Sequence, residues 1–476
     1  MKKAISTVLA LGMSLSMLTA CGGATSSSTA ASTAASESTA ASASTSAAAT
    51  GTGDYAGQTL KVAAIETAYG AEMWQQIADG FEAKTGATVE LTTDKNLEDV
   101  IDPQMKAGNF YDVVHLAAGR EKALPETMLK ENAIEEVTDV LSMNVLGEDI
   151  TVGEKIIPGF TGNLTTNPYG DDRVFMMPMF YGPCGLFYNK ANFTEGGGDL
   201  ELPTTWDEFF ALADQTDIPL FTYPVAGYLD AFTYALIAEI GGQDFFNKAL
   251  QYDETVWSSP EMDKMFEILG KLAENTNDAT TGYANNDNFT KNQQMILDNE
   301  ALFMPNGNWV IGEMAASTPD DFEWGMMPAP KWEGDETQAV YTFTEQMWIP
   351  ADAPNMDLAK EFIKFMYSDT VVDILLGNTT TDEETGEESP SPVVAPVKGA
   401  ADKLPEGTTK DCYAATTADD IVTVTGKWAT TAPIEGLNMN EATYKPIESI
   451  NTGDMTVEEW QAQLVETWEK CAAALE

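Results

Sequence analysis

LKVAAI at residues 60–65, TVEL at 88–91 and YDVVHL at 111–116 decide the fold class of this chain. Each run is short and rich in apolar or β-branched residues, as β-strands are. Apolar residues recur at helical spacing between the first two runs, and Thr85-Gly86 ends that helix with a glycine. A second helix is expected over about 96–107. Strand, helix and strand with short links predict parallel pairing through right-handed crossovers, so we expect an open α/β sheet.

The carboxyl ends of these strands are the expected place for a ligand, because open α/β sheets bind their ligands there. Residues 66–69, 94–95 and 115–118 would surround that mouth. The candidate binding residues in these segments are Glu66, Tyr69, Asp94 and His115. His115 is the one histidine of the chain and follows an apolar strand, so a buried imidazole that belongs to the core is an equal alternative to a ligand contact.

The N-terminus resembles that of a bacterial lipoprotein. Residues 1–3 are a basic start, and the apolar run 4–17 is too short and too interrupted to span a membrane as a helix. Leu18-Thr19-Ala20-Cys21 resembles a lipobox, whose cysteine is diacylated and becomes the first residue of the mature protein. Two acyl chains hold a protein on a membrane durably. We therefore expect a signal peptide over 1–20 and lipidation of Cys21, with an ordinary signal peptide and a chance cysteine as the alternative.

Residues 22–53 are almost wholly Ala, Ser, Thr and Gly, with Glu37 as the single charge. Such a stretch has no apolar pattern to bury and cannot offset the entropy of ordering. We expect residues 21–57 to be a flexible tether that begins at the lipidated cysteine. The rest of the chain, from 58 to 476, is long enough for two domains or one large two-lobed domain.

The chain is strongly acidic, with 25 basic and 75 acidic residues and a formal net charge of −50. Such a surface repels nucleic acid and anionic lipid, so we expect no nucleic-acid partner and attachment to the membrane through the lipid anchor only. Arginine occurs only at Arg120 and Arg173. Because bidentate arginine is the usual clamp for phosphates and carboxylates, the composition favours a neutral or cationic ligand.

Cysteine and histidine give no sign of a metal site or a cofactor. Cys184, Cys412 and Cys471 lie far apart in the sequence and allow at most one disulfide. A lone histidine excludes a zinc site built on histidines and weakens any catalytic triad. The acidic segment 382–388 lacks the spacing of a calcium loop, so a solvated loop is favoured. We expect no cofactor and no catalytic residue, although an enzyme that works with two carboxylates stays open.

Several motifs in the middle and C-terminal parts of the chain carry a resemblance to one family. They are Pro178–Gly182, Gly185–Lys190, Pro203–Phe209, Ala301–Trp309, Trp324–Pro330, the helix 357–367 with Ser368-Asp369 after it, and the closing helix 456–474. In this order they resemble extracellular solute-binding proteins of the sugar-binding type (family 1), which are lipoprotein components of carbohydrate ABC importers. The resemblance covers nearly all of residues 60–476.

This resemblance implies an α/β, two-lobed periplasmic-binding-protein-like fold with discontinuous lobes and a hinge between them. Carried onto this chain, lobe one comprises residues 58–177 plus 341–380, and lobe two comprises 179–339 plus 393–476. The chain crossings between the lobes are natural hinges, because a few backbone rotations there move whole lobes. The ligand is expected between the lobes.

A sugar site needs flat aromatic surface for the C–H faces of the ring and fixed polar groups for its hydroxyls. The stacking candidates are Tyr69, Tyr181, Trp309 and Trp348, and Tyr228, among the loops of lobe two, is a further candidate for the cleft. The candidate partners of the hydroxyls are Glu66, Asp94, Asn306 and Glu345. Glu345 lies where the family often has a glycine pair, so the bulk of residues 342–348 would narrow the site. A place in the core is the alternative for Trp309 and Tyr181, and it is favoured for Trp74, Trp206 and Trp460.

The resemblance thus predicts a lipid-anchored, monomeric receptor on the extracytoplasmic side of the cell membrane. It would capture a neutral sugar or oligosaccharide and deliver it to the permease subunits of an ABC transporter. Two alternatives stay open. A cell-surface glycosidase would need two carboxylates about 5 to 10 Å apart in its cleft. A wall-associated binding lipoprotein would share the anchor without a role in transport, whereas a structural adhesin would show repeats, of which the sequence has none.

Overall fold

The computed structural model describes residues 54–475 except 68, 121, 170, 226–227, 286, 333–337, 382–387, 419–420, 430–436 and 438. The expected signal peptide, Cys21 and the tether up to residue 53 lie outside the described residues, as does most of the acidic segment 382–388. Within the described part, the strands form an eight-stranded sheet and a separate two-stranded sheet.

The first part of the large sheet is parallel. β1 (Thr59–Ile65) pairs with β2 (Thr88–Asp94) on one side and with β3 (Val113–His115) on the other. α1 (Glu72–Thr85) and α2 (Leu97–Lys106) make the crossovers. α1 ends at Gly86, whose φ of 74° lies in the left-handed region that glycine adopts without strain. The strand and helix order predicted for residues 60–116 is confirmed. The apolar residues that recur at helical spacing in α1 are all buried: Met73, Trp74, Ile77, Ala78 and Phe81.

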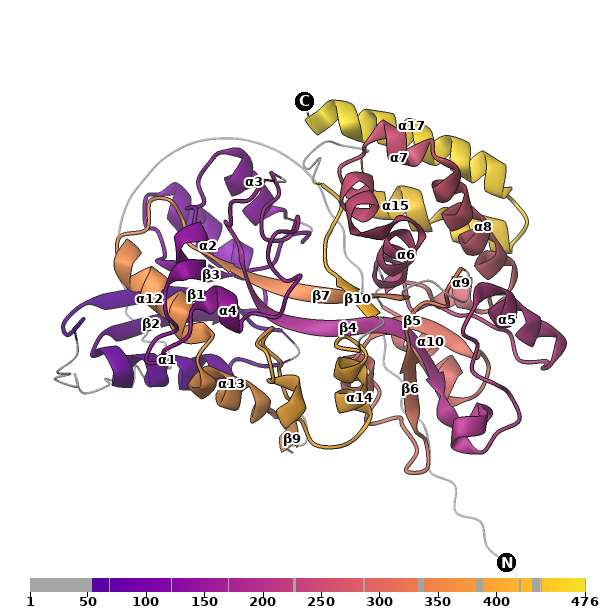
Figure 1. The fold of residues 1–476 in the computed structure, drawn as a ribbon, viewed down its shortest axis with the longest axis horizontal. Helices are drawn as coiled ribbons and strands as arrows, with labels where there is room; N and C mark the ends of the chain where they lie inside the picture. The colour runs from indigo at the N-terminus through magenta and orange to yellow at the C-terminus, as the bar shows by residue number, and fades with distance from the viewer. Residues whose placement is uncertain are drawn as a thin grey trace, which may run out of the picture. The chain divides into compact units, whose positions relative to one another are not determined.

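Two long antiparallel strands extend this sheet. β4 (Met177–Asn189) pairs with β7 (Gln338–Trp348), and β7 also pairs with β3. β4 pairs further along with β5 (Phe303–Gly307) and β6 (Trp324–Met327), and β10 (Ile421–Val424) pairs with β7. The resulting strand order is β2-β1-β3-β7-β4-β5. Figure 1 shows β4 and β7 side by side, running from the N-terminal helices to those formed by the middle of the chain.

The remaining helices cover these strands. Their bounds are α3 (Leu124–Lys130), α4 (Val152–Lys155), α5 (Trp206–Ala211), α6 (Leu229–Leu250), α7 (Glu254–Trp257), α8 (Pro260–Glu274), α9 (Thr280–Tyr283), α10 (Phe289–Leu297), α11 (Val310–Glu313), α12 (Met356–Met366), α13 (Asp369–Leu376), α14 (Thr408–Ala414), α15 (Met439–Tyr444), α16 (Pro446–Asn451) and α17 (Val457–Leu475). β8 (Thr379–Thr381) and β9 (Glu388–Pro390) form the separate hairpin. α5 begins at a capping box, in which the Thr205 hydroxyl and the Glu208 carboxylate each accept a hydrogen bond from the other residue's backbone N–H.

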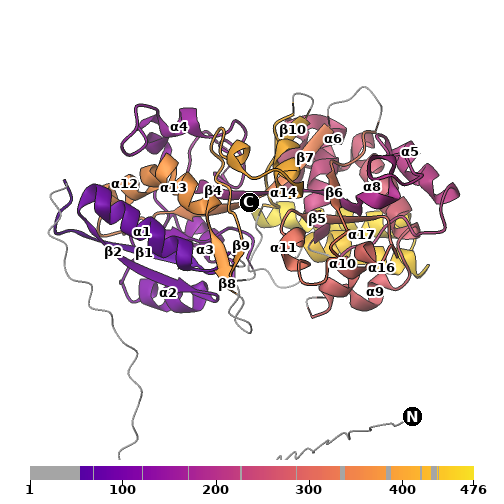
Figure 2. The same ribbon diagram turned by 90° about the horizontal axis from the view of Figure 1, so that it is seen from below.

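The apolar side chains gather mainly in two large cores. One joins β1 and α1 to α12 and α13, and the other joins α6 and α8 to α16 and α17. Figure 2 shows α1, α12 and α13 together, and α8, α16 and α17 together. Trp74 lies in the first core, and Trp206 and Trp460 lie in the second, as predicted. Residues 393–404, which the resemblance assigned to lobe two, pack apolar side chains against the first core. The bounds of the two lobes stay a prediction.

The described residues contain no candidate membrane-spanning helix and no disulfide. None of their helices combines the length and the apolar character needed to cross a membrane. Cys184, Cys412 and Cys471 are buried free thiols, so the structure does not join any two of them in the disulfide that the sequence allowed.

Candidate functional site

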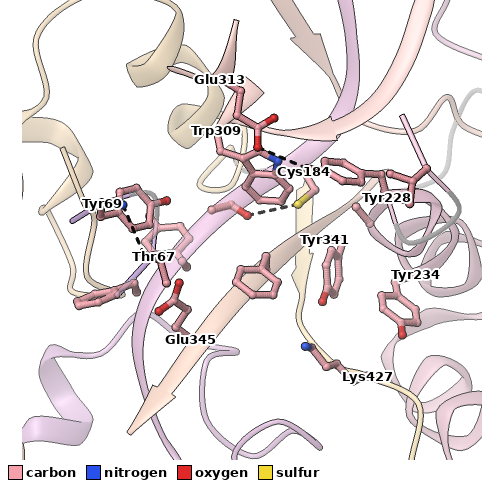
Figure 3. Close-up of a pocket in the computed structure, with 16 residues that line it drawn as sticks. Thr67, Tyr69, Cys184, Tyr228, Tyr234, Trp309, Glu313, Tyr341, Glu345 and Lys427 are labelled. Atoms are coloured by element: carbon pink, nitrogen blue, oxygen red, sulfur yellow. Dashed lines mark hydrogen bonds between the residues drawn. The ribbon is translucent and has the colours of Figure 1, made fainter. Parts of the chain in front are cut away.

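A cavity of about 510 Å³ lies along β4 and β7, between the segment after β1 on one side and α6 and α11 on the other. Half of the described residues that line it are aromatic: Tyr69, Phe180, Tyr181, Tyr228, Tyr234, Trp309, Tyr341 and Phe343. Its charged lining residues are Glu313, Glu345 and Lys427. Figure 3 shows Tyr69 and Glu345 on one side of this space, Tyr228 and Tyr234 on the other, and Trp309 between them.

The alternation of β7 supplies one wall of the cavity. Successive side chains of a strand point to opposite faces, so residues two apart share a face. Tyr341, Phe343 and Glu345 are spaced in this way, and all three line the cavity. Phe180 and Gly182 lie directly opposite Glu345 and Phe343 in the antiparallel pairing and line it as well. Two paired strands therefore place aromatic rings beside a carboxylate.

Trp309 follows β5 and immediately precedes α11. Its half-buried indole lies against two glycines: a Cβ atom at Gly307 would come within 2.0 Å of the ring, and one at Gly182 within 3.3 Å. These glycines let the ring approach the backbone of β4 and β5. The ring centroids of Tyr228 and Phe343 are 6.1 Å and 6.0 Å from that of Trp309, so three aromatic rings from different elements meet at the cavity.

A second carboxylate enters from α11. Glu313 accepts a hydrogen bond from the Gln293 side-chain amide at 2.7 Å and one from the Tyr228 hydroxyl at 3.4 Å. Burial raises the pKa of Glu313 above its usual range, and the hydrogen bond from Gln293 opposes that rise. Burial also raises the pKa of Tyr228, and the charge of Glu313 adds to it. Tyr228 therefore keeps its hydroxyl proton at neutral pH and can donate a hydrogen bond.

The cavity offers little to nucleophilic or metal chemistry. Cys184 lines it, but burial raises the pKa of its thiol to about 12, so the thiol stays protonated at neutral pH and is a poor nucleophile. Among the described residues, no group of three or more His, Cys, Asp and Glu side chains is arranged to hold a metal ion. Aromatic faces with carboxylate acceptors suit a ligand that presents apolar C–H faces and hydroxyl groups.

The structure brings five of the ten predicted binding residues to the cavity: Tyr69, Tyr181, Tyr228, Trp309 and Glu345. Tyr69 comes from the segment after β1, as the strand-end argument predicted. Burial raises its pKa, and the charge of Glu345 adds to the rise. Tyr181 is almost fully buried and packs edge-on against Tyr413, so it presents little surface to the cavity. That these five bind a ligand stays a prediction.

The other five do not line the cavity, for different reasons. Trp348 is fully buried, and its indole N–H donates to the Leu116 carbonyl oxygen at 3.1 Å. Asn306 is fully buried, and its side-chain oxygen accepts from the backbone N–H of Gly307 at 2.8 Å. His115 is 1% exposed and lies behind Glu345.

Glu66 and Asp94 are drawn into local interactions at the ends of β1 and β2. The Glu66 carboxylate lies 3.6 Å from the Lys95 amine, and the Asp94 carboxylate accepts from the backbone N–H of Asn96 at 2.7 Å. Cys21, the predicted lipidation site, lies outside the described residues.

Sequence reasoning missed several lining residues. Tyr341 and Phe343 could have been found, because they share the parity of Glu345 on one strand. Glu313 could also have been found, because it follows Trp309 by four residues, one helical turn. Lys427 had no sequence signal: it follows β10, and its amine reaches the Ala118 carbonyl oxygen after β3 only in the folded chain.

The sequence of this chain is similar to those of known solute-binding proteins. The model of the family described as bacterial extracellular solute-binding protein matches residues 63–373. The multiple sugar-binding protein of Streptococcus mutans serotype c is 24% identical over 282 residues, which are 52% of this chain and 65% of that protein. The diacetylchitobiose binding protein DasA of Streptomyces coelicolor is 23% identical over 334 residues, which are 67% of this chain and 71% of that protein.

A solved structure supports the architecture. The bacterial solute receptor AcbH, which has an exclusive substrate preference for β-D-galactopyranose, superposes with a TM-score of 0.65 and 16% identity over 87% of this chain and 98% of its own. The predicted α/β, two-lobed periplasmic-binding-protein-like fold is confirmed. At this identity the likeness shows the fold alone.

Proposed function

This chain belongs to the family of bacterial extracellular solute-binding proteins, and we propose that it is the receptor that captures a neutral sugar or oligosaccharide for an ABC transporter. The observation that carries the proposal is the lining of the cavity. Aromatic rings from β4, β7, α6 and the segment before α11 surround about 510 Å³, and two carboxylates at its wall can accept hydrogen bonds from hydroxyls. The sugar-binding relatives support the same ligand class.

The charged groups favour a sugar without phosphate. Both arginines are engaged outside the cavity lining, Arg120 with Glu98 at 2.6 Å and Arg173 with Asp171 at 2.7 Å. The bidentate clamp that usually holds a phosphate is therefore missing from the described lining. Lys427 lines the cavity, but its amine donates to a backbone carbonyl oxygen. The two lining carboxylates, Glu313 and Glu345, would repel a phosphate.

We further propose that a lipid on Cys21 holds the receptor on the extracytoplasmic face of the cell membrane. The lipobox over residues 18–21 and the Ala-, Ser- and Thr-rich composition of 22–53 support this arrangement. A flexible tether would let the folded part reach the permease subunits while it stays attached. The receptor works as a monomer, as the resemblance to the family implies, and the two lobes with the bounds predicted above close on the sugar.

A panel of sugars tests this function. Galactose, maltose, raffinose and N,N′-diacetylchitobiose are added to the purified protein in thermal unfolding and calorimetry experiments. At least one should bind, and a free concentration of 100 times its Kd should stabilise the fold by about 2.7 kcal/mol. Chromatography of the recovered sugar should show it unchanged, as a receptor returns it. Binding of amino acids or peptides with no sugar bound would refute the proposal, and a cleaved sugar would favour a glycosidase instead.

A further inference from the structure

The single histidine lies directly behind one cavity carboxylate. His115 pairs with Met347 across β3 and β7, and Glu345 precedes Met347 by two residues, on the same face of β7. This register makes His115 and Glu345 diagonal neighbours, a distance that long side chains span. The imidazole Nε2 atom lies 3.1 Å from the Glu345 Oε2 atom. Glu345 lines the cavity, whereas His115 does not.

The imidazole is fixed by aromatic packing. Its ring centroid is 4.7 Å from that of Trp74 on α1 and 5.0 Å from that of Phe180 on β4. Trp74 belongs to the buried face of α1, and Phe180 is the residue opposite Glu345 in the sheet. His115 is only 1% exposed. Packing on two sides restricts the movement of the ring, so the ring can limit where a neighbouring carboxylate rests.

Three buried polar atoms of His115 and Glu345 have no hydrogen-bond partner among the described residues. Neither ring nitrogen of His115, nor the Oε2 atom of Glu345, meets a partner at a hydrogen-bonding angle. Buried polar atoms without partners are rare and destabilising. The Nε2 and Oε2 atoms are nevertheless within hydrogen-bonding distance of each other, and the Glu345 side chain is 11% exposed at the cavity wall.

We infer that His115 is a positioning residue: it holds the Glu345 carboxylate against the cavity wall, where that carboxylate accepts hydrogen bonds from sugar hydroxyls. The inference rests on the proposed function and deepens it, because it assigns the sugar's polar anchor to Glu345 and the orientation of that anchor to His115. The sugar itself does not touch the histidine. The predicted ligand contact of His115 is thereby replaced by an indirect role.

A double-mutant cycle on sugar affinity tests this role. His115→Phe keeps an aromatic ring between Trp74 and Phe180 but removes both ring nitrogens. It should weaken binding of the panel sugar that binds the wild type by about tenfold, the effect of one lost hydrogen bond to a charged group. In a Glu345→Met background, which keeps the length of the side chain but has no oxygen, the same change should alter affinity by less than about twofold, because the acceptor that His115 orients is gone. Equal losses in the two backgrounds would overturn the inference.

The same question can be asked without changing the histidine. Because the chain has one histidine, its imidazole ¹⁵N signals in a protein without a histidine tag need no further assignment. Saturation with galactose, maltose, raffinose or N,N′-diacetylchitobiose, whichever binds, should shift these signals in the wild type and leave them in place in Glu345→Met. A shift of equal size in both proteins would overturn the inference, and this arm stands even where His115→Phe does not fold.

The two proposals fail separately. If no sugar of the panel binds the wild type, the proposed function fails. The ligand-free ¹⁵N spectra of wild type and Glu345→Met then decide whether His115 holds the carboxylate. Different ring-nitrogen shifts would support that contact, and identical shifts would refute it.

Discussion

Gly307→Ala should displace the indole of Trp309 without removing it. A Cβ atom at Gly307 would lie 2.0, 2.2 and 2.4 Å from three carbon atoms of that ring, where ordinary contact begins near 3.4 Å. The ring must therefore move by more than an ångström. Gly307 does not have a positive φ, so alanine adds no backbone strain and the effect is that of the contact alone. The Tyr228 and Phe343 rings flank the indole, and the displaced ring must move among the cavity aromatics.

The size of the effect follows from the cost of overpacking. One added methyl group in a filled site costs about 1–3 kcal/mol. If the added methyl group destabilises the sugar complex by this amount relative to the free protein, the affinity for the sugar drops about fivefold to a hundredfold. The free energy of unfolding should fall toward the low end of the same range, because the indole is only half-buried and can shift toward the cavity. Calorimetry with the panel sugar that binds the wild type measures the first quantity, and chemical unfolding measures the second.

Gly312→Ala is the matched control. Gly312 lies in α11, between Trp309 and Glu313, and a Cβ atom there meets nothing within 4 Å. Alanine is favoured over glycine in a helix by about 1 kcal/mol, so this variant should be equally stable or slightly more stable, with unchanged affinity. If Gly307→Ala binds sugar as the wild type does, the indole is not part of the binding surface and the reasoning is refuted.

Three further outcomes are expected. Trp309→Ala should weaken sugar binding at least about tenfold and lower the melting temperature by only a few degrees. Trp206→Ala, in the core, should instead lower the free energy of unfolding by about 3–5 kcal/mol. If Trp309→Ala does not fold, the indole of Trp309 is structural. Cys21→Ser should move the protein from the detergent phase to the aqueous phase on cell fractionation, since only the thiol accepts the lipid, and equal partitioning of both forms contradicts the lipobox. Glucose 6-phosphate should bind more weakly than glucose in calorimetry at moderate salt, because Arg120 and Arg173 do not line the cavity; tighter binding of the phosphate would show a clamp elsewhere.

Local pattern sufficed for the regular parts of the fold. The strands over 60–65, 88–91 and 111–116 and the helix between the first two are short-range features, and each carries its own period and stop signal. The pairing of β4 with β7 is different, because it joins residues far apart in the chain. The residue pattern of a strand does not show which other strand it pairs with. Only the resemblance to a family indicated that the chain crosses between two lobes.

The residues of the candidate site also differ in whether local sequence or tertiary packing brings them to the cavity. Tyr69, Tyr228 and Trp309 lie next to strand or helix ends, where local sequence already indicated a loop or a turn. Lys427 reaches the cavity through tertiary packing alone. Asn306 has a side chain that could bond a sugar, but its oxygen is taken by the adjacent backbone N–H. Local hydrogen bonding of this kind is invisible in residue type, because the same amide can serve either partner.

Trp348 shows an error that strand geometry could have prevented. Glu345 and Trp348 are three residues apart on β7, and residues an odd number apart on a strand point to opposite faces. Both could not line one cavity unless a bulge intervened between them, and the pairing of β7 with β4 and β3 has none there on the β7 strand. With Glu345 at the cavity, Trp348 must face the other side, where it belongs to the same apolar cluster as Leu97, Ile101 and Met128. The same parity requires Tyr341 and Phe343 to join Glu345, so one polar residue on a strand predicts which of its aromatic neighbours can meet a sugar.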